Sequence, residues 1–264
     1  MLERFRKAQL PGLESLRLRE KAGLLPPPYP GPRPPFAARL RENGPGAIIA
    51  EYKRASPSAG SINLAHGPED IAAAYAAAGA AALSVLTEET HFKGRLDYLA
   101  RMAGPGLPLL RKDFLLHPLQ VAETAATPAS ALLLIVRMLG DGELDALLRA
   151  AKAAGLEAVL EIFQRTDLER ARSALAKAAV SPAIIQVNNR DLQTLTLDAS
   201  LSRTLIRDRQ SREIWISASG ISRREEVEDR RELGFDAVLI GSALMSGADP
   251  GAALAALSGK GAAA

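Results

Sequence analysis

Cysteine is absent from the 264-residue sequence, and histidine occurs only three times, at His66, His91 and His117. Without cysteine there can be no disulfide, no thiolate nucleophile and no cysteine-ligated zinc. The three histidines lie far apart in sequence and form no metal-binding spacing. The residues therefore predict no metal site, and each histidine is expected on the surface or in a loop.

Aromatic residues make up only 4% of the chain, and no basic stretch has the interleaved aromatics that stack on bases. No apolar run approaches the ~18 residues of a membrane span, and the first residues lack the apolar core of a signal peptide. Lysine and arginine exceed aspartate and glutamate by 33 to 30. We expect a cytoplasmic protein with no nucleic-acid or membrane partner, and the small positive balance is compatible with an anionic substrate.

The first 44 residues look different from the rest of the chain. Residues 1–24 scatter leucine among charged residues as a helix would, and residues 25–35 are too rich in proline for a helix or a central strand. Residues 36–41 are long enough for a short helix. We predict an N-terminal helical extension over residues 1–44 that packs on a larger domain at 45–258, followed by a frayed tail at 259–264.

From residue 47 onward, short apolar runs alternate with helical stretches. There are eight such runs: 47–53, 81–86, 107–112, 131–135, 156–161, 183–187, 213–217 and 237–240. Helices are expected between them at 69–78, 118–126, 142–154, 167–179 and 223–233. Eight strand–helix units of this length predict an α/β fold, the (β/α)8 or TIM barrel. The competing doubly wound sheet would often carry a glycine-rich turn after its first strand, and here that loop reads Ser56-Pro57-Ser58.

Polar residues stand where several of these runs end. The first run ends in Glu51 and Lys53, the third in Lys112, the fifth in Glu161, and the sixth continues into Asn188. In barrels of this type, active sites lie at the carboxyl ends of the strands. These side chains are therefore predicted to converge on one rim.

The residue types suggest roles at that rim. Two lysines near Glu51 and Glu161 can bind a substrate carboxylate, donate a proton to a carbonyl oxygen, or form a Schiff base, and the sequence does not choose among these. Gly220 and the Gly241-Ser242 pair follow the last two runs, where such barrels often bind phosphate, and the Ser56 hydroxyl can add a donor. Tight turns between strand and helix are the alternative reading of these glycines.

Several stretches resemble indole-3-glycerol phosphate synthase, a lyase family of tryptophan biosynthesis. The most specific are the Glu51-Tyr52-Lys53-Arg54-Ala55-Ser56-Pro57-Ser58 and Arg111-Lys112-Asp113-Phe114 stretches, and others are Asn188-Asn189-Arg190-Asp191 and Ser219-Gly220-Ile221. The resemblance runs from about residue 45 to 246. It implies a barrel that converts 1-(2-carboxyphenylamino)-1-deoxyribulose 5-phosphate, with loss of CO2 and water and without a cofactor.

The resemblance also implies a role for each matching residue. Lys112 would be the general acid, Lys53 would bind the substrate carboxylate, Glu161 would be the general base, and Glu51 and Asn188 would orient Lys53 and the substrate. Phosphate would be held by Ser56, Gly220, Gly241 and Ser242. Other substrate contacts would come from Phe92, Phe114, Arg190, Ser219 and again Ser56.

The sequence departs from the family at four positions: Ala218 replaces a glutamate, Gln186 a glycine, His91 a phenylalanine and Arg95 a serine. Losing the carboxylate at position 218 should lower the pKa values of the lysines. The alternatives are a paralog acting on a related phosphosugar amine and a phosphate-binding barrel with little turnover. An Amadori-type isomerase would typically need a Cys or Asp base pair near the strand ends; the chain has no Cys, and Lys53, Lys112 and Glu161 fit the synthase better. The oligomeric state stays open between a monomer and association with other tryptophan-pathway enzymes.

Overall fold

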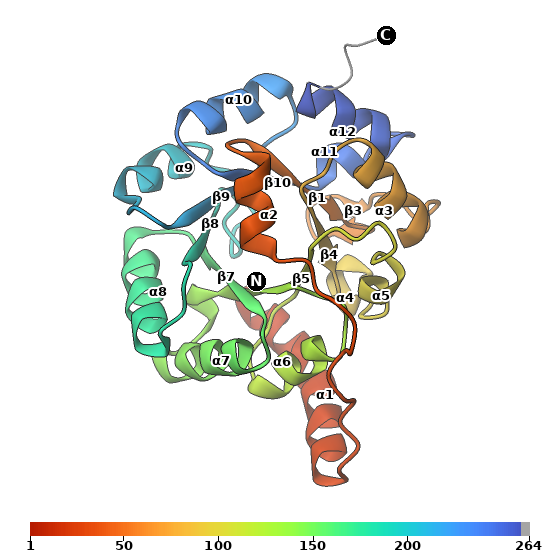
Figure 1. Cartoon of the computed structure of the whole chain (residues 1–264), viewed down its shortest axis with the longest axis vertical. Helices are drawn as coiled ribbons and strands as arrows, with labels where there is room; N and C mark the ends of the chain where they lie inside the picture. Colours follow the sequence, from red (N-terminus) through yellow and green to blue (C-terminus); the bar gives the residue numbers. More distant parts are fainter. Residues whose placement is uncertain (260–264) are drawn as a thin grey trace.

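The computed structural model describes residues 1–259 and has eight parallel strands closed into a barrel (Figure 1). The strands are β1 (Ala47–Tyr52), β4 (Ala82–Leu86), β5 (Leu109–Lys112), β6 (Ala131–Ile135), β7 (Glu157–Ile162), β8 (Ile184–Asn188), β9 (Ile214–Ala218) and β10 (Ala237–Ile240). Each pairs with its neighbour in sequence order, and β10 pairs with β1. The predicted (β/α)8 barrel is confirmed, and every predicted run supplies one strand.

Helices cover the outside of the barrel in the connections between strands. The longer ones are α3 (Pro68–Ala77), α6 (Pro118–Ala125), α7 (Asp141–Ala153), α8 (Arg165–Ala178), α10 (Arg224–Glu232) and α12 (Pro250–Ser258). Shorter turns of helix are α4 (Glu89–Phe92), α5 (Tyr98–Arg101), α9 (Ser200–Leu205), α11 (Ser242–Met245), η1 (Val136–Met138) and η2 (Ile206–Asp208). The five predicted helices correspond to α3, α6, α7, α8 and α10. A small hairpin, β2 (Ala55–Ser56) with β3 (Gly60–Ser61), follows β1.

The strands are apolar on both faces because both faces are covered. Along β1, Ala47 and Ile49 face the barrel interior, whereas Ile48 and Tyr52 pack towards the helices outside. Glu51 follows Ile49 on the interior face. This alternation places the polar residues at the strand ends inside the rim of the barrel.

Helix α1 (Leu2–Lys21) lies at the carboxyl ends of the strands. Its Phe5 ring stacks on Phe114 after β5 at 4.3 Å between centroids. Arg6 donates to the carboxylate of Glu143 at 2.8 Å, and Gln9 donates to Asp113 at 3.0 Å. From these contacts α1 runs outward past α6 and projects beyond the barrel (Figure 1).

Helix α2 (Phe36–Asn43) contacts the opposite end of the barrel. The backbone N–H groups of Phe36 and Ala37 donate to the carboxylate of Glu157, which opens β7. The proline-rich segment between the two helices runs past the end of α6, where the Tyr29 N–H donates to the Ala125 carbonyl at 2.8 Å. The N-terminal extension therefore contacts both ends of the barrel.

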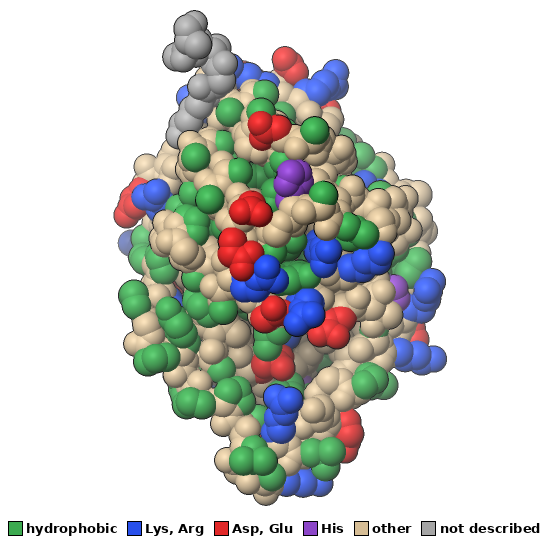
Figure 2. Space-filling view, turned by 90° about the vertical axis from the view of Figure 1, so that its right-hand side faces the viewer, with side chains coloured by type: hydrophobic (Ala, Val, Ile, Leu, Met, Phe, Trp, Pro, Cys, Tyr) green, Lys and Arg blue, Asp and Glu red, His purple; other side chains and the backbone are tan. Residues whose placement is uncertain are grey.

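The tail predicted at 259–264 lies, apart from Gly259, outside the described residues. Within residues 1–259, no helix has the length and apolar character needed to cross a membrane. The described part of the chain also holds no cluster of three or more metal-binding side chains. Figure 2 shows lysine and arginine side chains interspersed with aspartate and glutamate on one face of the molecule.

Candidate active site

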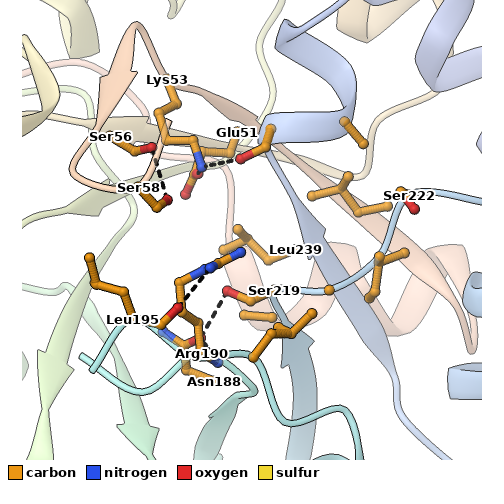
Figure 3. A pocket seen from close by; sticks show the side chains of 18 of the residues that line it. Glu51, Lys53, Ser56, Ser58, Asn188, Arg190, Leu195, Ser219, Ser222 and Leu239 are labelled. Atoms are coloured by element: carbon orange, nitrogen blue, oxygen red, sulfur yellow. Dashed lines mark hydrogen bonds and ion pairs between the residues drawn. The ribbon is translucent and has the colours of Figure 1, made fainter. Parts of the chain in front are cut away.

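The barrel opens at the carboxyl ends of its strands into a cavity of about 500 Å³ (Figure 3). Side chains from β1, β5, β8, β9 and β10, and from the loops that follow them, form its wall. Eleven of the thirteen predicted site residues line it: Glu51, Lys53, Ser56, Phe92, Lys112, Asn188, Arg190, Ser219, Gly220, Gly241 and Ser242. The other two, Glu161 and Phe114, lie behind residues that do.

Glu51 is the centre of the charged part of the cavity. Its carboxylate is 3.3 Å from Lys53 Nζ through Oε1 and 3.6 Å from Lys112 Nζ through Oε2. The Glu51 side chain is only 4% exposed. One buried carboxylate therefore bridges two ammonium groups. Lys53, just after β1, and Lys112, at the end of β5, both point towards it.

The charges of this cluster fix its protonation. Burial acts to raise the pKa of the Glu51 carboxyl, but the positive charges of Lys112 and Lys53 outweigh it, so that the pKa is lowered and Glu51 is ionised. Burial likewise acts to lower the pKa of Lys112. The negative charges of Glu51 and Glu161 outweigh that effect and raise the pKa of Lys112 above its usual value.

The lower pKa expected for the lysines is relative to a site that has the carboxylate at position 218, and it stays a prediction. Even without that carboxylate, the pKa of Lys112 lies above its usual value. Glu51 and Glu161 supply enough negative charge without it. Lys112 is a protonated ammonium at neutral pH, which suits a cation or a general acid. A Schiff-base lysine must instead present a neutral amine, so the structure disfavours that role.

Glu161 is buried at the end of β7, with 1% of its surface exposed. The Gln186 side-chain amide donates to Glu161 Oε2 with 2.5 Å between nitrogen and oxygen, and Asn188 hydrogen-bonds to the same carboxyl. Burial raises the pKa of Glu161, and Lys112 and the two amides only partly oppose that rise. Glu161 therefore changes its protonation closer to neutral pH than an ordinary glutamate, as a general base requires.

The far wall of the cavity is built from the turns after β9 and β10. Lys53 Nζ donates to Ser242 Oγ at 2.8 Å. A Cβ atom at Gly241 would lie 2.3 Å from Glu51 Oε1, so only glycine lets the chain pass this close to the carboxylate. Ser219 and Gly220 both have positive φ, 68° and 76°. Two successive left-handed residues form a turn of the kind whose N–H groups can face an anion.

Ser56 lies in the β2–β3 hairpin on the opposite side of the cavity mouth (Figure 3). Its Oγ is 3.4 Å from the Oγ of Ser58 and accepts a hydrogen bond from the Ala59 N–H. Ser58 also lines the cavity. The first loop therefore brings two hydroxyl groups to the site.

Three phenylalanines make the apolar end of the site. Phe92 lines the cavity, and its ring lies 6.1 Å from those of Phe5 and Phe114. Phe114 does not reach the cavity, because Phe5 from α1 stacks over it and lines the cavity itself. The His91 ring packs edge-on against Phe5 with 5.1 Å between centroids, and its Nδ1 lies 3.0 Å from the Glu88 carboxylate.

The loop after β8 closes one side of the cavity. Arg190 is anchored by a hydrogen bond from its Nη1 to the Leu195 carbonyl at 3.0 Å. Leu192, Leu195 and Leu197 of the same loop line the cavity, and Leu197 packs so closely on Gly220 that an added Cβ would lie 3.0 Å from it. This side of the site is apolar apart from Arg190.

Sequence reasoning did not name Phe5 or the three loop leucines as site residues. Phe5 stands 46 positions before Glu51 and reaches the site only through the path of α1. Gln186 was noted as unusual but not assigned to the site. Its position two residues before Asn188 on a strand is a signal for it, since alternate residues share a face.

The closed (β/α)8 barrel has two lysines and a bridging carboxylate in its carboxyl-end cavity, and a carboxylate with a raised pKa lies just behind them. This arrangement is typical of an enzyme that works by acid–base chemistry. Comparison with known proteins gives the family. The model of the family described as indole-3-glycerol phosphate synthase matches residues 18–257. The chain belongs to this family.

Two relatives named indole-3-glycerol phosphate synthase illustrate the match. The one from Opitutus terrae is 44% identical over 232 residues, covering 85% of each chain. The one from Dehalococcoides mccartyi strain CBDB1 is 40% identical over 255 residues, covering 94% of this chain and 96% of the relative. The similarity therefore extends beyond the barrel strands into the N-terminal extension.

Solved structures of other enzymes share the fold. A tryptophan synthase alpha-subunit from Pyrococcus furiosus aligns with a TM-score of 0.62 at 14% identity, covering 82% of this chain and 99% of that one. A 3-hexulose-6-phosphate synthase from Salmonella typhimurium aligns with a TM-score of 0.63 at 18% identity, covering 81% and 97%. At these identities the likeness concerns the barrel alone.

Proposed function

We propose that this protein is an indole-3-glycerol phosphate synthase, which closes the indole ring of 1-(2-carboxyphenylamino)-1-deoxyribulose 5-phosphate with release of CO2 and water. The observation that carries the proposal is the pair formed by protonated Lys112, which lines the cavity, and Glu161, an ionisable carboxyl buried just behind the cavity wall. Family membership supports the same reaction.

In the first half of the reaction, the ring carbon that bears the carboxylate attacks the substrate carbonyl carbon. Lys112 donates a proton to the carbonyl oxygen as the carbon–carbon bond forms, and CO2 then leaves the ring carbon. Lys53 binds the substrate carboxylate. Glu51, held between the two lysines at 3.3 and 3.6 Å, keeps both of them charged and in place.

In the second half, the new hydroxyl group takes a proton from the Lys53 ammonium and leaves as water. The adjacent ring carbon loses its proton, and the new five-membered ring becomes aromatic. Glu161 accepts the proton that this elimination releases. Its raised pKa supports this role, because a base that titrates nearer neutral pH accepts a proton more readily and returns it afterwards. Asn188 lies between Glu161 and the cavity and orients the substrate against both groups.

The phosphate and the aromatic ring of the substrate are assigned to two different sides of the cavity. Phosphate is assigned to the turns at Gly220 and Gly241-Ser242, with Ser56 across the mouth. The aromatic ring is assigned to the apolar side, where Phe92 is backed by Phe114 and where Arg190 and Ser219 supply polar contacts. No metal or cofactor takes part in this scheme. We assign residues 1–44 to the extension that completes the apolar side and residues 45–258 to the catalytic barrel.

The test is a fluorescence assay for indole-product formation from the carboxyphenylamino-deoxyribulose phosphate. We expect wild-type turnover and a loss of about 10²–10⁴-fold in kcat for Lys112→Ala, the usual contribution of a general acid. The exposed Lys177→Ala of α8 is the matched control and should keep wild-type activity. A wild type that binds the substrate without forming product would contradict the proposal.

Ala218 is the one cavity residue that favours another activity, because it offers only a methyl group where the family has a carboxylate. Ala218→Glu in the same assay measures the cost of that change. If neither wild type nor Ala218→Glu forms an indole product, a paralog acting on a related phosphosugar amine takes the place of the synthase.

A further inference from the structure

Gln186 is a polar side chain in the sealed interior of the barrel. It is 0% exposed, and it does not line the cavity. In the strand register it sits beside Glu161 of β7 on one side and Ile216 of β9 on the other. Its side chain therefore lies one layer below the cavity, at the level of the buried carboxylate.

The nitrogen and the oxygen of the Gln186 side-chain amide have different surroundings. The nitrogen donates to Glu161 Oε2 at 2.5 Å, whereas the oxygen has no hydrogen-bond partner among the described residues. A buried polar atom without a partner costs stability, and an apolar side chain of the same size would avoid that cost. Filling space does not explain an amide at this position.

Asn188, two residues later on the same face of β8, is oriented by its other contacts. Its Oδ1 accepts hydrogen bonds from the Arg190 N–H at 3.0 Å and from Ser219 Oγ at 2.9 Å. Its amide nitrogen is left for Glu161, to which Asn188 also hydrogen-bonds. Ala218, the register partner of Asn188 on β9, contributes only a methyl group. Strand β8 thus supplies two amide donors to one carboxylate.

We propose that Gln186 is a positioning residue that holds Glu161 as an oriented, ionisable base from beneath the active site. The proposal rests on the proposed function, in which Glu161 accepts the proton. The charged groups that face Glu161 are Lys112 from β5 and Glu51 from β1, and their effects on its pKa are opposite in sign. The Gln186 donor favours the ionised form of Glu161, in the same direction as Lys112.

The experiment compares the pH profile of kcat/KM in wild type, Gln186→Met and Gln186→Glu. Methionine keeps the size of the side chain but removes the donor. The fall in activity at acid pH should then begin at a pH roughly one unit higher. At neutral pH we expect kcat to fall by about tenfold to a hundredfold with KM within about twofold of wild type.

Gln186→Glu sharpens the result, because a second carboxyl at hydrogen-bond distance must share a proton with Glu161. The acid-side fall in activity should then move to still higher pH than in Gln186→Met. Gln210→Met removes an exposed glutamine that lies before β9, away from the site, and is the matched control with an unchanged profile. Unchanged profiles in both Gln186 variants, with a wild-type melting temperature, would overturn the proposal.

A second readout does not depend on turnover. Infrared or carbon NMR titration of isotope-labelled glutamate carboxyls, with Glu161→Gln used to assign the signal, follows the ionisation of Glu161 directly. In Gln186→Met this titration should move to higher pH. If wild type proves inactive, the proposed function fails. If the Glu161 titration is the same with and without Gln186, the positioning role fails, whatever the activity.

Discussion

Strand β7 carries a glutamate near each end, and the two have opposite surroundings. Glu157 lies at the amino end of the barrel, where its carboxylate accepts hydrogen bonds from the first two N–H groups of α2. Glu161 lies at the carboxyl end beside Lys112, Gln186 and Asn188. Burial is the largest influence on both carboxyls and raises the pKa of each.

The comparison shows that a raised pKa does not by itself mark a catalytic group. Glu157 accepts hydrogen bonds from backbone donors of a neighbouring helix and lies away from the carboxyl-end cavity, so its role is to hold α2 against the barrel. Glu161 meets a lysine and two side-chain amides that adjoin a cavity. What faces the carboxyl, rather than how deeply it is buried, separates the structural end of the barrel from the reactive one.

The largest effect should come from removing the base at the reactive end. Glu161→Gln keeps the size of the side chain but cannot accept the proton, so kcat should fall by about 10²-fold or more. The assay is indole-product formation, with circular dichroism to show that the barrel remains folded. Near-normal turnover in this variant would remove the distinction between the two glutamates.

A smaller loss of activity is expected when a side chain is added at the carboxyl end of the barrel, close to Glu51. Gly241→Ala places a methyl group 2.3 Å from the present position of Glu51 Oε1, so the carboxylate between the two lysines must move. We expect kcat/KM to fall by about tenfold or more. Gly142→Ala in α7 is the matched control, since a Cβ there meets no atom within 4 Å, and it should leave the rate unchanged.

A substitution at the amino end of the barrel should change the stability of the protein and leave its catalytic rate unchanged. Glu157→Ala removes the acceptor for two N–H groups at the start of α2 and should lower the free energy of unfolding by about 1 kcal/mol. Denaturant titration measures this, and the rate assay on the same sample should give wild-type kcat/KM. A loss of activity in a fully folded Glu157→Ala protein would contradict the assignment.

The finest distinction is in the pH dependence: ionising Glu161 raises activity, whereas ionising Glu157 lowers stability. Activity should rise with pH through the raised pKa of Glu161, above the ordinary glutamate value of 4.5, because the base works when ionised. The raised pKa of Glu157 adds a proton-linked part of the stability that is fully present below 4.5 and is lost as pH rises through the folded pKa, whereas the hydrogen bonds to α2 remain. Profiles of kcat/KM and of unfolding free energy, recorded on one preparation, separate the two.

Much of this arrangement could be predicted from the sequence, because it depends on local patterns. Strand alternation places Glu51 and Lys53 on one face, and the ends of parallel strands bring Lys112 and Asn188 to the same rim. All four line one cavity in the structure. The strand count was equally accessible, since each apolar run is bounded by turns or helical stretches.

What could not be predicted depends on the path of the chain through space. Phe5 covers Phe114 only because α1 crosses the carboxyl ends of the strands, and no local pattern encodes that crossing. Leu195 enters the cavity wall through a left-handed turn at φ 62° in a loop of irregular sequence. The raised pKa of Lys112 depends on the summed charge of Glu51 and Glu161, which only their positions reveal.

The N-terminal extension, which touches both ends of the barrel, has a consequence for synthesis on the ribosome. Phe36 hydrogen-bonds to Glu157, made 121 residues later, and Arg6 to Glu143, made 137 residues later. At about 5–20 residues per second, the extension waits roughly 6–27 seconds for these partners to be made. The extension therefore leaves the ribosome well before the residues that it contacts, and Phe5 can take its place at the active site only after Phe114 has been made.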